Sequence, residues 1–253
     1  MPASFTSADL GGGVRSLTLR NEGRKNALDD TALSQLKGAL QSSEGVRCWL
    51  VRGDGGAFSA GYDLSALGAV AQGPLPDDFI GDVFDLLQSH SVPSVALVTG
   101  PAFGAGCELA CACDFRVGNA DALFCLPPAK IGVVYAARGI RRVAALTGLG
   151  YAKWMLLTGA RIDADQALQR GLLDVKAEAA ESAALKVCAD LAGAAPLAVA
   201  GMKRTFHALM QGGPDAAEAR ALEGLRRAAF NSADAKEGRE AFLARRLPRF
   251  SGT

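Results

Sequence analysis

Short apolar runs alternate with helix-like stretches over roughly the first half of the chain, from Val14 to about Phe124. The apolar runs predict strands at residues 16–19, 48–52, 94–98 and 115–118. Apolar side chains that recur every three or four positions predict helices at residues 29–42 and 77–89. Strands that alternate with helices need crossover connections, so the fold class is α/β with a largely parallel sheet.

Strand signals fade after about Gly139, and the rest of the chain reads as helical. Helices are predicted at residues 140–146, 151–157, 163–169, 181–192, 196–210, 216–230 and 233–244. Pro196 suits the first turn of such a helix. We therefore divide the chain into an α/β core at residues 1–195 and a helical region at residues 196–253.

Composition narrows the classes of partner. A formal net charge of +1 disfavours nucleic acid and anionic membranes. Four of the six cysteines occur in apolar or small-residue runs without paired CxxC spacing, which predicts reduced, buried thiols and a cytoplasmic location. Only His90 and His207 could supply imidazole, and both are interpreted as structural, so no metal is expected. Residues 92–115 are interrupted by proline and glycine and should not span a membrane, and the N-terminus lacks a secretory pattern.

Two segments have the pattern of a strand that turns into a helix. Residues 57–64 follow one apolar run, and residues 100–109 follow another. A helix start leaves backbone N–H groups unpaired and partly positive. Free donors are predicted at Tyr62 and Ala105. Two such donors aimed at one point stabilise an oxygen that becomes negative during a reaction.

These two segments, with residues 23–28, 157–162 and 237–243, resemble the signature regions of the crotonase, or enoyl-CoA hydratase/isomerase, superfamily over nearly the whole chain. The resemblance implies a ββα spiral core, a C-terminal helical region that forms a homo-trimer or hexamer, an acyl-CoA substrate, and no cofactor apart from the CoA of that substrate. It also implies that the path of the CoA nucleotide and pantetheine is lined by Arg24, Lys25, Ala60, Asp63 and Leu64. Arg24 and Lys25 could instead be a solvated surface pair.

In the same resemblance, Glu108 matches one of two glutamates with which hydratases hold and activate water. Pro128 occupies the place of the second glutamate, which weakens a hydratase or isomerase interpretation. Residues 68–76 are predicted to form a mobile loop that could close over a substrate. Arg245, Arg246 and Arg249 could contact CoA phosphates.

The pattern around Tyr135, with residues 196–198 and 226–228, is most similar to the methylmalonyl-CoA decarboxylase branch. In that branch a tyrosine at the place of Tyr135 and a glutamate at the place of Glu108 lie near the substrate carboxylate, although a histidine is common where this chain has Tyr62. The favoured hypothesis is a lyase that decarboxylates a short malonyl-type CoA. The alternatives are an enoyl-CoA hydratase or isomerase that acts through Glu108 alone, and a non-catalytic acyl-CoA binder. Glu108 could instead be a carboxylate placed near a helix N-terminus because it interacts favourably with the helix dipole. Tyr135 could be a residue of the pocket wall whose hydroxyl is hydrogen-bonded locally.

Overall fold

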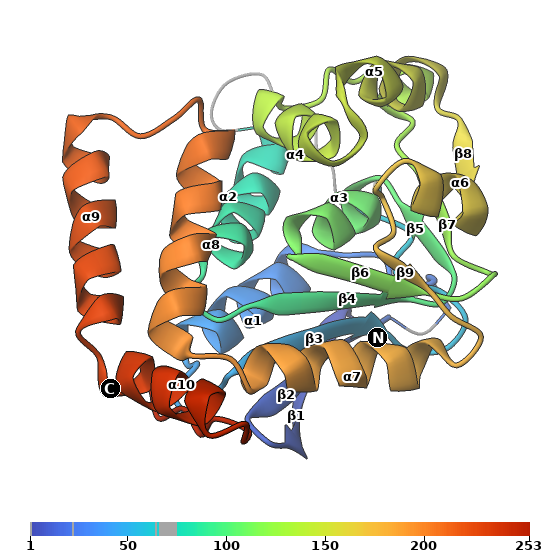
Figure 1. Ribbon diagram of the computed structural model, residues 1–253. Coiled ribbons are helices and arrows are strands. Elements are labelled where there is room, and N and C mark those ends of the chain that lie inside the picture. Colours follow the sequence, from blue (N-terminus) through green and yellow to red (C-terminus); the bar gives the residue numbers. More distant parts are fainter. Residues whose placement is uncertain (1, 22, 64, 66–74) are drawn as a thin grey trace.

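The computed structural model describes residues 2–21, 23–63, 65 and 75–253. Its larger sheet has six strands in the order β1-β2-β3-β4-β6-β9 (Figure 1). Their bounds are β1 Ser4–Gly11, β2 Val14–Arg20, β3 Cys48–Gly53, β4 Ser94–Val98, β6 Phe115–Gly118 and β9 Val175–Lys176. All neighbours from β2 to β9 pair in parallel, and β1 pairs antiparallel with β2. The predicted α/β class and largely parallel sheet are confirmed.

A smaller sheet has the order β5-β7-β8, with bounds β5 Pro101–Phe103, β7 Leu123–Cys125 and β8 Arg161–Asp163. The sequence pattern predicted none of these three strands, nor β1 and β9. The expectation that only helices follow Gly139 is wrong, because β8 and β9 both lie there. These two strands have three and two residues, which is too short for an alternating pattern to stand out.

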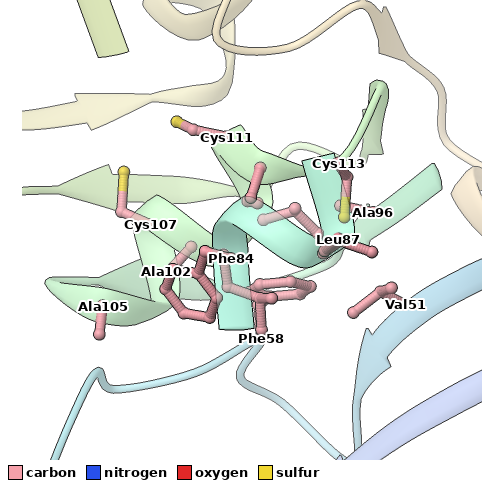
Figure 2. Packing of buried hydrophobic residues seen from close by; sticks show 14 of the residues in the cluster. Val51, Phe58, Phe84, Leu87, Ala96, Ala102, Ala105, Cys107, Cys111 and Cys113 are labelled. Atoms are coloured by element: carbon pink, nitrogen blue, oxygen red, sulfur yellow. The ribbon is translucent and has the colours of Figure 1, made fainter. Parts of the chain in front are cut away.

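Helices cover both faces of the larger sheet. The main core lies on the face that carries Trp49 and Val51, where α1 (Asp30–Gln41), α2 (Pro76–Ser89) and α3 (Ala105–Ala112) pack. Cys48 and Leu50 alternate to the opposite face and pack against α7 (Ala180–Ala192). Figure 2 shows part of the main core, with Phe58 from the segment after β3 lying beside Phe84 of α2. The segment after β3 is thus anchored in the main core beside α2.

The remaining helices follow the predicted order. They are α4 Ala137–Thr147, α5 Leu149–Thr158, α6 Ala164–Gln169, α8 Pro196–Met210, α9 Ala216–Phe230 and α10 Ala233–Leu243, with a short 3-10 helix, η2, at Pro128–Ile131. Pro196 occupies the first turn of α8, as predicted. Figure 1 shows α9 lying along the outer side of α8, away from the sheets. The boundary at residue 196 and the trimer or hexamer stay predictions.

All six cysteines are buried free thiols. Burial is the main reason that the pKa of Cys113 is raised to about 12. Within the described ranges, no cluster of three His, Cys, Asp or Glu residues could hold a metal ion. No single helix in those ranges is long and apolar enough to cross a membrane; α7 and α8 reach the required length and hydropathy only together, across a bend of 106°.

Candidate active site

The two predicted turns meet in space through backbone pairing. The Ser59 N–H donates to Pro101 O at 3.0 Å, and the Phe103 N–H donates to Ser59 O at 2.9 Å. Close approach requires glycine at two positions. A Cβ on Gly61, whose φ is +98°, would lie 2.7 Å from Phe103 O, and a Cβ on Gly106 would lie 2.6 Å from Ser59 O. The first turn and the start of α3 are therefore locked against each other.

This packing brings the two predicted backbone donors together. The place where a Gly61 Cβ would stand is 3.4 Å from the Ala105 nitrogen, and Tyr62 follows Gly61 directly. Ala105 is the first residue of α3, where a helix leaves its N–H free. Tyr62 forms an isolated bridge with Leu28 that uses the flanking Gly61 O and Asp63 N–H, and the helix expected after it falls largely on residues outside the described ones. In the described part of the chain neither the Tyr62 nor the Ala105 N–H has a hydrogen-bond acceptor.

A cavity of about 250 Å³ opens beside these donors, and it is called the acyl cavity below. The predicted residues that line it are Ala60, Tyr62, Ala105, Glu108 and Tyr135. Its remaining wall comes mainly from α2, from η2 and the residues around it, and from α4, and includes Ile80, Leu126, Pro128, Ile131 and Val133. Most of this wall is apolar, which suits a short acyl chain.

Glu108 and Tyr135 form the polar end of the acyl cavity. Glu108 is 5% exposed, and its Oε2 is hydrogen-bonded to the Tyr135 hydroxyl at 2.5 Å. A Cβ on Gly139 would stand 2.5 Å from the Tyr135 ring and 2.8 Å from Glu108 Oε1, so this pair depends on a glycine in α4. Burial raises the pKa of the Glu108 carboxyl, against the lowering effects of Arg142 and Tyr135. Burial, and then Glu108, raises the pKa of Tyr135.

Two arginines near this carboxyl were not predicted from the sequence: Arg142, which lies behind Glu108, and Arg138, which itself lines the acyl cavity. The buried Arg142 guanidinium joins Glu108 Oε1 to Asp85 of α2. Arg138, one turn earlier in α4, pairs with Asp82 at 2.7 Å and with Asp85 at 3.3 Å. The spacing of arginines in α4 and of acidic residues in α2 was the available signal, because residues three or four apart share a helix face.

Comparison with known proteins places the chain in a family. The model of the enoyl-CoA hydratase/isomerase family matches residues 9–253 of this chain. The chain belongs to this family. Its relatives include a probable enoyl-CoA hydratase of Mycobacterium leprae, 32% identical over 95% of this chain and 96% of the relative. They also include methylmalonyl-CoA decarboxylase of Escherichia coli, 31% identical over 92% of each chain.

The fold agrees with solved members of the enoyl-CoA hydratase/isomerase family. An enoyl-CoA hydratase from Bacillus anthracis has a TM-score of 0.89 and is 26% identical, with 99% of this chain and 100% of that chain covered. One from Polaromonas sp. JS666 has a TM-score of 0.87 and is 27% identical, with 98% and 100% covered. The crotonase fold is thereby confirmed, and this protein is an acyl-CoA enzyme of that family.

The Tyr62 side chain lies on the cavity wall, but its hydroxyl is engaged elsewhere. It donates to Asp30 Oδ1 at 2.8 Å, and burial together with this bond raises the pKa of Tyr62 to about 12. A further carboxylate, Asp77 at the start of α2, also lines the acyl cavity and was not predicted. Among the described residues, the wall of the acyl cavity therefore carries the carboxyl groups of Glu108 and Asp77.

Some of the residues expected to line the CoA path lie together at the first turn. Arg24 forms an ion pair with Asp63, and hydrogen bonds from Ser65, followed by Arg24, lower the pKa of Asp63. Lys25 O accepts from the Ala60 N–H at 2.9 Å, but Lys25 lines a separate surface cavity rather than the acyl cavity. Leu64 and residues 68–74 of the predicted mobile loop lie outside the described residues. The roles of these residues in CoA binding stay predictions.

Proposed function

We propose that this enzyme decarboxylates a short malonyl-type acyl-CoA. The observation that carries the proposal is the engagement of Glu108: one carboxyl oxygen pairs with Arg142 and the other is bonded to Tyr135. Pro128, which stands where hydratases carry their second glutamate, offers no titratable group on the cavity wall. Addition of water needs a base and an acid beside the substrate, whereas loss of CO₂ needs no general base.

The backbone donors suit the first step. The thioester oxygen would accept hydrogen bonds from the Tyr62 and Ala105 N–H groups. As the bond to the carboxylate carbon breaks, its electron pair passes into the thioester and forms an enolate, and neutral CO₂ leaves. Each aimed donor can lower the barrier by about 3 kcal/mol, on the scale of measured oxyanion-hole deletions. The apolar residues Leu126 and Val133 on the wall favour a neutral product over a carboxylate.

A proton must then reach the enolate carbon, because one proton is consumed for each CO₂ released. The Tyr135 hydroxyl borders the cavity and is bonded to Glu108. When Glu108 is protonated, Tyr135 can give its proton to the carbon as it takes the Glu108 proton. Since burial raises the pKa of Glu108, that proton is available closer to neutral pH than from an exposed glutamate.

Hydration is the second candidate, and one observation favours it. Asp77 places a carboxylate on the cavity wall that could partner Glu108 in activating water. Several relatives are named hydratases, among them the 2,3-dehydroadipyl-CoA hydratase of Escherichia coli, 32% identical over 94% of this chain and 95% of the relative.

The test is a mass-resolved turnover assay with methylmalonyl-CoA, ethylmalonyl-CoA and crotonyl-CoA. Loss of CO₂ from the malonyl-type esters, abolished in Tyr135→Phe or Glu108→Gln but retained in Asp77→Asn, is the expected result. Asp190→Asn, an exposed substitution on α7, is the control. Water addition to crotonyl-CoA alone, lost in Asp77→Asn, would overturn decarboxylation in favour of hydration. Binding of all three esters without turnover would indicate a non-catalytic binder.

A further inference from the structure

Arg142 is the least exposed charged residue in the ionic network behind Glu108. Its side chain is 1% exposed, and it does not line the acyl cavity. Besides Glu108 and Asp85, its guanidinium donates to Gln88 Oε1 at 3.3 Å and to Gly81 O at 3.4 Å. An arginine does not lose its proton in a protein, so this is a permanent positive charge directly behind Glu108.

The direction of the Glu108–Tyr135 hydrogen bond depends on the Glu108 proton. An ionised Glu108 only accepts, and the Tyr135 hydrogen then points away from the substrate. A protonated Glu108 can donate to Tyr135 and release the tyrosine hydrogen toward the acyl cavity. A permanently protonated carboxyl would not be able to give up a proton at each turnover, and a permanently ionised one would have none to give.

We propose that Arg142 is a positioning residue that holds the Glu108 carboxyl toward Tyr135 and serves as its counter-charge, so that Glu108 can release and regain a proton in each catalytic cycle. Its catalytic part rests on the proposed function, whereas its effect on the Glu108 proton does not. Asp85 also pairs with the Arg142 guanidinium, which weakens the electrostatic attraction between Arg142 and Glu108. In the part of the chain that the structure describes, the other titratable or charged groups near Glu108 are Cys107 and Cys111 of α3, Arg138 of α4, Tyr135, and Asp77 on the cavity wall.

The experiment measures protonation of Glu108 by infrared difference spectroscopy against pH, with Glu108→Gln as the spectral reference. In Arg142→Gln the carboxyl should ionise at a higher pH than in the wild type, because the opposite charge is gone. Arg142→Lys should keep the charge and restore most of the wild-type titration. Asp85→Asn should move the titration to lower pH, because it removes a competing carboxylate.

Kinetics supply the second readout. Arg142→Gln should lose about 10²-fold in kcat at neutral pH with little change in KM, as expected for a misplaced catalytic group. Its kcat profile should be displaced to alkaline pH. Arg116→Gln breaks another buried arginine–carboxylate pair, with Asp174, that lies outside the acyl cavity, and should leave both readouts unchanged.

The outcomes separate this inference from the proposed function. A Glu108 titration that is the same in the wild type, Arg142→Gln and Asp85→Asn overturns the role of Arg142, even if the wild type decarboxylates. A shifted titration in an enzyme that releases no CO₂ supports the role of Arg142 and overturns decarboxylation. If Arg142→Gln does not fold, Arg142→Lys and Asp85→Asn decide, since their expected titrations differ.

Discussion

A single methyl group at Gly139 should damage the active site more than the fold. A Cβ there would stand 2.5 Å from Tyr135 Cε1, where ordinary contact begins near 3.4 Å, so the ring must retreat by about 0.9 Å. The same methyl would lie 2.8 Å from Glu108 Oε1 and 3.0 Å from its Cδ, and Arg142 holds that carboxyl in place. Gly139→Ala therefore separates the two groups to which the proton step is assigned.

The two consequences differ in size. Alanine in a helix is favoured over glycine by about 1 kcal/mol, and forcing an extra methyl into a packed core costs about 1–3 kcal/mol. The net destabilisation of Gly139→Ala is therefore about 0–2 kcal/mol, or a fall in Tm of at most about 8 °C. A displacement near 1 Å in a catalytic group lowers kcat/KM about 10²-fold, which is about 2.7 kcal/mol in the barrier.

The assay compares kcat/KM for the ester that the wild type turns over with Tm from thermal unfolding. Gly38→Ala is the matched control, because Gly38 lies inside α1 with nothing within 4 Å of its added Cβ. It should raise Tm by about 2–4 °C and leave kcat/KM unchanged. The reasoning would be refuted if Gly139→Ala kept the wild-type kcat/KM, or if Gly38→Ala lost as much activity as Gly139→Ala.

Three further predictions concern residues outside the Glu108–Tyr135 pair, namely Tyr62 and Glu237. Tyr62→Phe should change kcat/KM by less than about threefold, since the proposed donor is the backbone N–H. Because the Tyr62 pKa rises from 10.0 to about 12 on folding, its contribution to stability is complete below pH 10 and is lost between pH 10 and about 12; the difference in Tm from Tyr62→Phe should shrink over that range. Hydrogen bonds from Arg246 and the Arg249 N–H lower the Glu237 pKa from 4.5 to about 2, so the stabilisation exists above pH 4.5 and is lost between pH 4.5 and about 2. Melts of Glu237→Gln should accordingly converge with wild-type melts in that acid range, and a constant difference would contradict the assignment.

The C-terminal helices could be predicted closely from the sequence because each has a local signal. α8 and α9 begin and end at the predicted residues, with Pro196 in the first turn of α8 and Asp215 capping α9. Strand β9 was missed for the opposite reason: its two residues are a strand only because β6 lies beside them.

The candidate site was predicted where it follows from turn motifs, and missed where it depends on contacts between distant elements. Ala105 and Glu108 lie at the start of one helix, so the motif located both. The contact of Arg142 with Asp85 joins two helices that are 57 positions apart at these residues; the local spacing of charges on each helix is a signal, but it does not show that the two helices pack together. The engagement of the Tyr62 hydroxyl by Asp30 was missed for the same reason.

The donors assigned to the enolate oxygen belong to the main chain, and this has a consequence for how the enzyme could change. Their placement depends on Gly61 and Gly106, which permit the close approach of the two turns, and not on the side chains at positions 62 and 105. Substitutions along the apolar wall or at the polar end of the cavity can therefore alter which acyl group enters and where its proton goes while the anion-stabilising centre persists. Selection or engineering can therefore change the substrate or the proton step on this scaffold while the backbone donors stay in place.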